Sequence, residues 1–219
     1  MSALPKSPLT ISRPRLSARS AAKFVRLPAV EQMRLLHDQK YPKQTPQVFK
    51  QPYYAPPLNG IRDFLDRGLP GLVDARAKIQ SLSIKSRRDH CNRVLTQFVE
   101  SGHAHRGLKP TTMLRCYASM SDLELRLSPD LCAMDGKLQR VIYFNANASE
   151  QDPEAAKMTL EIAHWVLEQN GENVAPRQLE FIDLFSGKVF SINRRRQKTI
   201  KLLEENARLI ESLWSAIEP

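Results

Sequence analysis

The chain has 219 residues, of which 42% are hydrophobic and 26% charged, a composition typical of a soluble globular protein. Its three cysteines are far apart and form no CxxC pair, which excludes a disulfide framework or zinc ribbon and suits a reducing cytoplasm. No apolar run approaches about 18 residues, so we expect no membrane partner. The formal net charge of +10 favours an acidic partner, most often DNA or RNA.

We expect the chain to divide near residue 85, into a basic, proline-rich, helical N-terminal region (1–85) and a core domain (86–219). The N-terminal region should contain short helices, over residues 17–26, 29–38, 59–67 and 72–82. Residues 41–60 contain five prolines, which lack an amide donor and fix φ, so this segment should be extended and irregular. We expect its aromatic side chains to pack over the domain surface, although they could also stack on bases; they are Phe49, Tyr53 and Tyr54.

Hydrophobic periodicity is clearer in the core domain. Residues 86–101 place their apolar side chains on one helical face. Strands are expected over 112–119 and 122–127, and in the second of these leucines alternate with charged residues, as in a half-buried strand. Asp135-Gly136 predicts a two-residue hairpin turn, after which the chain returns as a strand over 138–147.

The sequence Asp152-Pro153-Glu154 predicts the start of the next helix. Aspartate can cap free amides, proline fits the first helical position, and glutamate suits the helix dipole. Gly171 ends this helix, and two short strands are expected around Ser186-Gly187. The order of helix, antiparallel strands, helix, strand pair and helix predicts an α/β protein of the α+β type, with a mixed central sheet flanked by helices.

A long C-terminal helix is expected over residues 194–216. Its apolar residues repeat every seven positions, and they are Ile200, Leu203, Ala207, Ile210, Trp214 and Ile217. Additional leucines widen this stripe, and a wide stripe usually packs on the protein's own core. The alternative is that the helix forms a homodimer or enters a groove of a protein partner.

Residues 128–147, SPDLCAMDGKLQRVIYFNAN, place Pro129-Asp130 before the expected hairpin and the apolar run VIYF in its returning strand. Together with the order helix, three strands, helix, strand, this resembles the PD-(D/E)xK superfamily, the restriction-endonuclease-like and RecB-like nucleases. The resemblance implies that Asp130 starts the second strand of the hairpin, and that an acid-x-lysine triplet ends the next strand. In that family the two acids hold one or two divalent cations, which polarise the phosphate and help to activate a water.

The chain departs from this pattern at the triplet. Tyr143 stands where the second acid is expected, and Asn145 where the lysine is expected. A shift by two positions puts Asn145 at the acid and Asn147 at the lysine. Neither alignment restores a carboxylate or an ammonium group, and an amide carbonyl brings no charge to a hard cation. Asp130 alone should therefore bind magnesium poorly.

Three interpretations of the hairpin are open. In the plainest, Asp130 caps a turn and Tyr143 packs beside the strand. In the second, the domain is a degenerate nuclease-like domain that needs no cofactor. In the third, the protein is an active nuclease that uses magnesium bound by Asp130, with Glu124 or Glu100 as the second acid.

Two groups of basic residues stand at expected helix starts. Three arginines there oppose the helix dipole, which favours acids, and a local rule broken in this way indicates a function. Helix-start amides and arginine forks form good phosphate sites. If instead the last helix begins only at Lys198, the arginines lie on a solvated loop. The two groups, expected to form one basic face, are Lys85, Arg87 and Arg88, and Arg194, Arg195, Arg196, Lys198 and Lys201.

These observations favour a nucleic-acid-binding protein over an enzyme. We expect a catalytically degenerate, nuclease-like subunit of a nucleoprotein complex, whose arginines supply salt-dependent contacts to phosphates. The first alternative is an active nuclease that depends on a divalent metal. The second is an adaptor subunit whose basic face meets an acidic protein.

Overall fold

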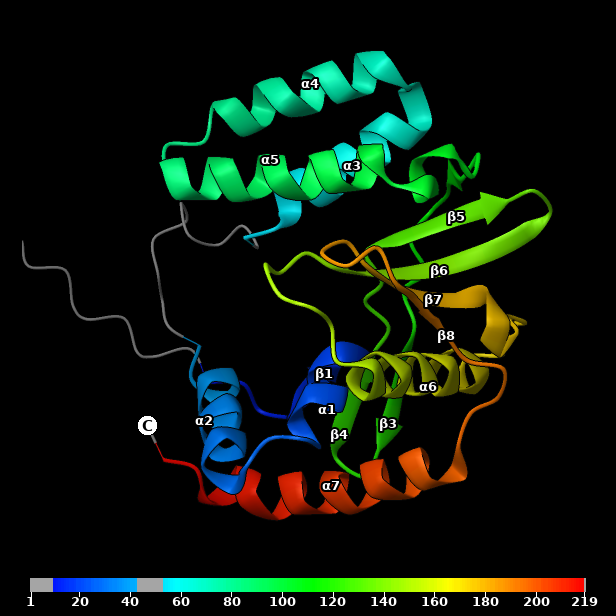
Figure 1. The fold of residues 1–219 in the computed structure, drawn as a ribbon. Coiled ribbons are helices and arrows are strands. Elements are labelled where there is room, and N and C mark those ends of the chain that lie inside the picture. Colours follow the sequence, from blue (N-terminus) through cyan, green and yellow to red (C-terminus); the bar gives the residue numbers. More distant parts are fainter. Residues whose placement is uncertain (1–9, 43–52, 219) are drawn as a thin grey trace, which may run out of the picture.

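The computed structural model describes residues 10–42 and 53–218, which form an α+β fold of helices and two mixed sheets (Figure 1). The predicted mixed central sheet flanked by helices is confirmed, and so is the long C-terminal helix. None of the helices in the described part of the chain combines the length and the apolarity that a membrane crossing requires.

The central sheet has five strands. Its strands in spatial order are β2 (Lys109–Pro110), β5 (Leu131–Asp135), β6 (Leu138–Asn145), β7 (Leu179–Asp183) and β8 (Val189–Ser191). β5 and β6 form the predicted hairpin, and Gly136 in its turn has a φ of 61°, which glycine adopts without strain. β6 and β7 are parallel, because helix α6 (Pro153–Gln169) carries the chain back between them.

A second, three-stranded sheet is not predicted by the sequence. β1 (Arg15–Ser17) pairs in parallel with β4 (Leu123–Arg126), which pairs antiparallel with β3 (Tyr117–Met120). The predicted alternation in β4 is confirmed, since its two leucines are buried and its charged residues are not. The strands expected at 112–119 and 122–127 are thus shorter than predicted and belong to this second sheet.

The remaining helices agree with the predicted positions to within a few residues. The largest difference is in α3, which begins at Ala55 rather than at residue 59. Pro56 and Pro57 lie in its first turn, where a missing amide donor costs no hydrogen bond. The elements are α1 (Ala18–Phe24), α2 (Ala29–Lys40), α3 (Ala55–Arg67), α4 (Leu69–Gln80), α5 (Lys85–Glu100), and the 3-10 turns η2 (Gly102–His105) and η3 (Pro176–Gln178).

The structure is layered around two hydrophobic cores. From top to bottom, Figure 1 shows α4, then α3 and α5, the central sheet, α6, the three-stranded sheet, and α7 (Gln197–Ala216). One core joins α3, α4 and α5 to one face of the central sheet. The other joins α1, α6, α7 and the three-stranded sheet to its opposite face. Residues before 85 contribute to both cores. The division into 1–85 and 86–219 stays a prediction.

Of the two long helices of the second core, α6 begins at the predicted cap and α7 begins later than predicted. The Oδ1 atom of Asp152 accepts hydrogen bonds from the amides of Glu154 (2.8 Å) and Ala155 (3.2 Å), which confirms the predicted cap of α6. α7 begins at Gln197, not at residue 194, so the three arginines precede it. The apolar stripe of α7 is buried in the protein's own core. That burial removes the face on which a homodimer or a partner groove was predicted.

Candidate functional site

Asp130 lies directly before β5, at the end of the central sheet where β6 and β7 finish. Its Oδ2 atom accepts hydrogen bonds from Arg19 Nη2 (2.6 Å) and from the amide of Phe144 (2.7 Å). The Asp130 amide donates to the carbonyl of Ile142 (2.9 Å), which fixes the residue against β6. The Asp130 side chain is 13% exposed and that of Arg19 is 42% exposed. The carboxylate predicted to hold a metal is therefore paired with an arginine.

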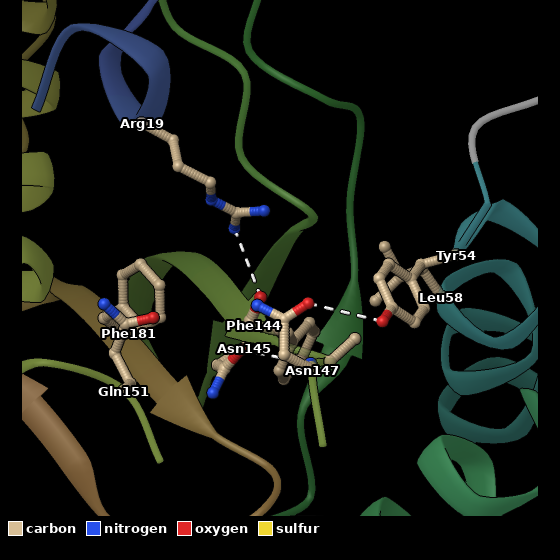
Figure 2. Close-up of a pocket in the computed structure, with 9 residues that line it drawn as sticks. Arg19, Tyr54, Leu58, Phe144, Asn145, Asn147, Gln151 and Phe181 are labelled. Atoms are coloured by element: carbon tan, nitrogen blue, oxygen red, sulfur yellow. Dashed lines mark hydrogen bonds between the residues drawn. The ribbon is translucent and has the colours of Figure 1, made fainter. Parts of the chain in front are cut away.

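Arg19 reaches this site from α1, 111 residues earlier in the chain. Its Nη2 also donates to the carbonyl of Phe144 (3.3 Å), as Figure 2 shows. Its guanidinium lies 5.4 Å from the ring centroids of both Tyr143 and Phe181, a cation–π arrangement. The guanidinium is thus held by a carboxylate, a carbonyl and two aromatic rings.

Tyr143 and Asn145, which stand where the acid and the lysine are expected, both make contacts within the protein. Tyr143 is fully buried and its ring stacks on Phe181, with 6.2 Å between centroids. Burial raises the pKa of Tyr143, so its hydroxyl stays neutral. Asn145 Nδ2 donates to Asp183 Oδ1 and to the carbonyl of Ser149, both at 2.8 Å. The plainest interpretation therefore holds for Tyr143, which packs beside the strand.

Asp183, at the end of β7, is a second carboxylate near this end of the sheet, and the sequence analysis missed it. Besides Asn145, it accepts hydrogen bonds from the amide of Gln151 (2.9 Å), the hydroxyl of Ser186 (2.6 Å) and the amide of Phe185 (3.1 Å). Burial raises the pKa of Asp183, but these hydrogen bonds outweigh burial and hold the pKa below its usual value. The signal in the sequence was an acid directly after the apolar run of a strand.

A pocket of about 100 Å³ opens between α1, the start of α3 and the end of β6 (Figure 2). On its rim, the hydroxyl of Tyr54 donates to Asn147 Oδ1 at 3.3 Å. The polar groups of the lining are one guanidinium, three amides and a phenol, with no carboxylate among the lining residues. Its polar lining residues are Arg19, Tyr54, Asn145, Asn147 and Gln151. Such a lining suits an anionic group that accepts hydrogen bonds.

The two alternative acids have other positions. Glu124 lies on β4, in the three-stranded sheet, where its Oε1 is 2.5 Å from Arg15 Nε. Glu100 is the exposed last residue of α5. Within residues 10–42 and 53–218, no three histidine, cysteine, aspartate or glutamate side chains are grouped so that they could hold a metal ion. Asp130, Glu124 and Glu100 therefore do not assemble the predicted nuclease site.

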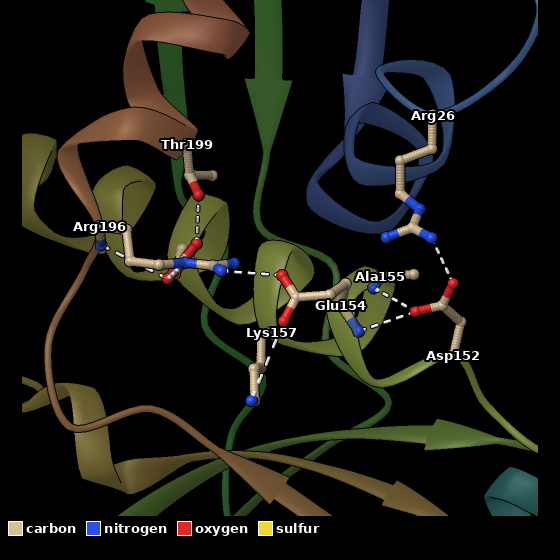
Figure 3. Close-up of polar contacts among 8 residues, drawn as sticks. Arg26, Asp152, Glu154, Ala155, Lys157, Arg196 and Thr199 are labelled. Atoms are coloured by element: carbon tan, nitrogen blue, oxygen red, sulfur yellow. Dashed lines mark hydrogen bonds and ion pairs between the residues drawn. The ribbon is translucent and has the colours of Figure 1, made fainter.

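Two of the three arginines before α7, Arg195 and Arg196, connect this helix to α6. Arg196 Nε is 2.6 Å from Glu161 Oε1, and its Nη1 is 2.8 Å from Glu154 Oε2 (Figure 3). Thr199 donates to the same buried Glu161, and Arg195 pairs with Glu168. Of the group predicted to contact phosphate, the exposed members are Arg194, Lys198 and Lys201.

The basic residues at the start of α5 are also held locally, and one of them, Arg87, contacts Tyr53, which precedes the pocket residue Tyr54. Lys85 pairs with Asp89 (2.8 Å), and Arg88 donates to the carbonyl of Leu82 (2.6 Å). Arg87 Nε donates to the carbonyl of Tyr53 (3.3 Å), and its guanidinium lies 5.5 Å from the centroid of the Tyr53 ring.

The starts of α5 and α7 are at opposite corners of Figure 1, so the two basic groups do not form the single face that was predicted.

The expected packing of the aromatic residues is only partly correct. Tyr54 is half-buried and lines the pocket, but Tyr53 is 44% exposed, and Phe49 lies outside the described residues.

The chain matches no protein-family model and no curated protein sequence. Any assignment of function therefore depends on the arrangement of the residues around the pocket at the end of β6.

Proposed function

We propose that this protein binds nucleic acid through a nuclease-like core that does not cleave its ligand. The observation that carries the proposal is the ion pair between Arg19 and Asp130. In the nucleases that the chain resembles, the matching aspartate holds a divalent cation, whereas here a guanidinium occupies its Oδ2 atom. With β3 and β4 set aside, because they belong to the three-stranded sheet, the chain order α5, β2, β5, β6, α6, β7 follows the pattern helix, three strands, helix, strand and supports the resemblance.

The same contacts argue against metal-dependent cleavage. A divalent cation at Asp130 has to displace a charged hydrogen bond of 2.6 Å and would find uncharged Tyr143 and Asn145 at the neighbouring positions. The other carboxylate at this end, Asp183, is fully buried and already accepts four hydrogen bonds. Magnesium is bound through carboxylates and water in near-octahedral geometry. No such set is offered at this end of the sheet by the described residues.

Charge and exposed aromatic surface support nucleic acid as the ligand. The formal net charge is +10, and two acids next to Gln151 in the sequence are each paired with a cation, Asp152 with Arg26 and Glu150 with Lys188. Asp183, in contrast, is held by uncharged donors. Arg93 adds positive charge behind the pocket, since it donates to the uncharged carbonyl of Ala146 (2.9 Å). Arginine forks suit phosphates, and an exposed tyrosine suits a base.

The state of the cysteines supports a reducing compartment, and we place the protein in the cytoplasm on this ground. Cys91, Cys116 and Cys132 are free and buried. Burial raises the pKa of each thiol, which keeps these side chains protonated and poorly reactive.

Fluorescence anisotropy with labelled DNA and RNA tests the proposal, at about 50 mM and about 200 mM salt. We expect binding at the lower concentration and a loss of about 10-fold or more in affinity at the higher one. The same oligonucleotides, incubated with magnesium or manganese, should remain intact. Absence of binding even at low salt would contradict the proposal and favour the adaptor. Cleavage that disappears in Asp130→Ala would show instead an active nuclease.

A further inference from the structure

We infer that the ligand is a single strand, with one phosphate group in the Arg19 pocket and the neighbouring base stacked on Tyr53. This inference rests on the proposed function and specifies the class of nucleic acid that the same site takes. Two features carry it, the pocket at the end of β6 and the tyrosine platform beside it. The platform consists of Tyr53, Tyr54, His90 and Arg87.

The pocket has the size and chemistry for a phosphate group. Its volume of about 100 Å³ leaves room for a small polar group such as a phosphate. Arg19 lines the cavity and its side chain is 42% exposed, so a ligand can reach its guanidinium. The amides of Asn147 and Gln151 supply further donors on the lining. A phosphate oxygen satisfies such donors.

The platform presents one ring partly to solvent, with the Arg87 guanidinium over that ring and the rings of Tyr54 and His90 in contact with it. Tyr53 is 44% exposed. Its ring meets Tyr54 edge to face with 5.0 Å between centroids, and His90 with 5.9 Å between centroids. Arg87 adds a guanidinium at 5.5 Å. Because Tyr54 also lines the pocket, the platform and the pocket are contiguous, and a strand can place a phosphate in one and a base on the other.

This arrangement selects for unpaired bases. The bases of a duplex are already stacked and paired, so stacking one on Tyr53 requires that it first be extracted. A single strand offers its bases to an aromatic side chain without that cost. Contacts to phosphates alone do not discriminate in this way, because both forms carry them. We therefore expect tighter binding of a single strand than of a duplex of the same length.

The first test replaces Tyr53 with alanine and uses Tyr117→Ala as the matched control. Tyr117 is a tyrosine of β3, 53% exposed, on the three-stranded sheet. Anisotropy is measured with oligothymidine of about 12 nucleotides and with a blunt duplex of equal length. Tyr53→Ala should weaken binding of the single strand about 10-fold and leave duplex binding unchanged. Equal effects of the two substitutions would overturn the stacking contact.

The second test concerns the pocket and uses the double substitution Arg19→Gln and Asp130→Asn, which exchanges an ion pair for a neutral pair. Potassium phosphate and potassium chloride are compared as competitors of oligothymidine at equal ionic strength. Phosphate should compete better than chloride against the wild type but not against the double variant, and thermal unfolding checks that the variant is folded. The double substitution Arg67→Gln and Asp74→Asn, which neutralises an exposed ion pair elsewhere, is the matched control. Equal competition by the two salts in the wild type would overturn the phosphate site.

The results separate the inference from the proposal on which it rests. A wild-type protein that binds neither single strand nor duplex at low salt contradicts the proposed function itself. A wild-type protein that binds both equally well, with Tyr53→Ala indistinguishable from the wild type, contradicts only the inference.

Discussion

The two ends of the central sheet both carry charged side chains, but in opposite arrangements. At the turn between β5 and β6, Arg106 and Arg140 share Asp135 and Glu180 at distances of 2.6 to 3.2 Å, so two cations meet two acids. The Glu180 side chain is only 8% exposed. At the other end Arg19 meets one acid and also lines a pocket with amides. At the first end the cations and acids satisfy one another in a closed network, whereas at the second end hydrogen-bond donors face a cavity.

The comparison shows that a group of arginines is not by itself a binding site. The arginines before α7 belong with the closed network, because Arg195 and Arg196 are matched by acids of α6. A site additionally needs space and a surplus of donors, and the pocket beside Arg19 has both. The predictions below test whether charge at one end maintains the fold and charge at the other end serves a ligand.

The largest effect is expected from Arg106→Leu, which removes one of the two cations around Glu180. Its fork donates to both oxygens of Glu180 and to Asp135, and the lowered pKa of Asp135 arises first from this hydrogen bond. We expect the free energy of unfolding to fall by about 3 kcal/mol, measured by urea denaturation at neutral pH. Arg67→Ala, which breaks an exposed pair with Asp74, should cost less than about 1 kcal/mol. Equal losses in the two variants would contradict the comparison.

The next effect is expected at Asp183, where the substitution Asp183→Asn replaces an acceptor oxygen by a donor. The amide of Gln151 and the hydroxyl of Ser186 both donate to Oδ2, and Oδ1 likewise accepts two hydrogen bonds. Whichever oxygen becomes the NH2 group, two donors lose their acceptor. We expect a loss of about 2 kcal/mol near neutral pH. Because the native pKa is lowered, the stability due to Asp183 is present above its usual pKa of about 4 and is lost as the pH falls through the native pKa.

The difference between wild type and Asp183→Asn should therefore shrink as the pH is lowered from about 5 to about 2. Other carboxylates with lowered pKa, such as Asp135 and Glu154, titrate in both proteins and cancel in the difference. Thermal unfolding at a series of pH values measures this difference in stability between the two proteins. A difference that is constant with pH would mean that the charge of Asp183 is not stabilising.

Local signals in the sequence predicted most elements of the fold. The Asp135-Gly136 turn, the cap at Asp152 and the leucine alternation in β4 each depend on a few neighbouring residues. The second sheet was not predictable in this way. β1 has three residues, too few to show a period of two, and its pairing with β4 joins Leu16 to Leu125 across about half of the chain.

The candidate site was only partly predictable, because some of its features depend on neighbouring residues and others depend on tertiary packing. Pro129-Asp130 before a hairpin is a local signal, and the absence of charge at positions 143 and 145 was read correctly from the residue types. The pairing with Arg19 depends on how α1 packs against the sheet, which no local pattern encodes. The start of α7 was placed too early because its arginines were assigned to the helix, although they are held by side chains of α6.

A smaller effect is expected from Arg196→Ala, which tests whether the arginines before α7 are structural. Glu161, with a side chain 2% exposed, would retain Thr199 but lose its ionic partner. We expect a loss of about 1.5 kcal/mol, below the value for a fully buried pair because the Arg196 side chain is 41% exposed. Lys198→Ala should change stability by less than about 0.5 kcal/mol. Neither substitution should alter nucleic-acid affinity by as much as Tyr53→Ala does.

The smallest effect on stability is expected for the pair at the pocket. A double-mutant cycle of Arg19→Gln and Asp130→Asn should give a coupling of about 1 kcal/mol, since the Arg19 side chain is 42% exposed and solvent screens the pair. The corresponding cycle of Arg106→Leu and Glu180→Leu should give a larger coupling, because the Glu180 side chain is almost fully buried. If the coupling between Arg19 and Asp130 were as large as that between Arg106 and Glu180, Arg19 would contribute to stability as much as Arg106 does. A weak coupling combined with a loss of phosphate competition is the result that assigns Arg19 to the ligand.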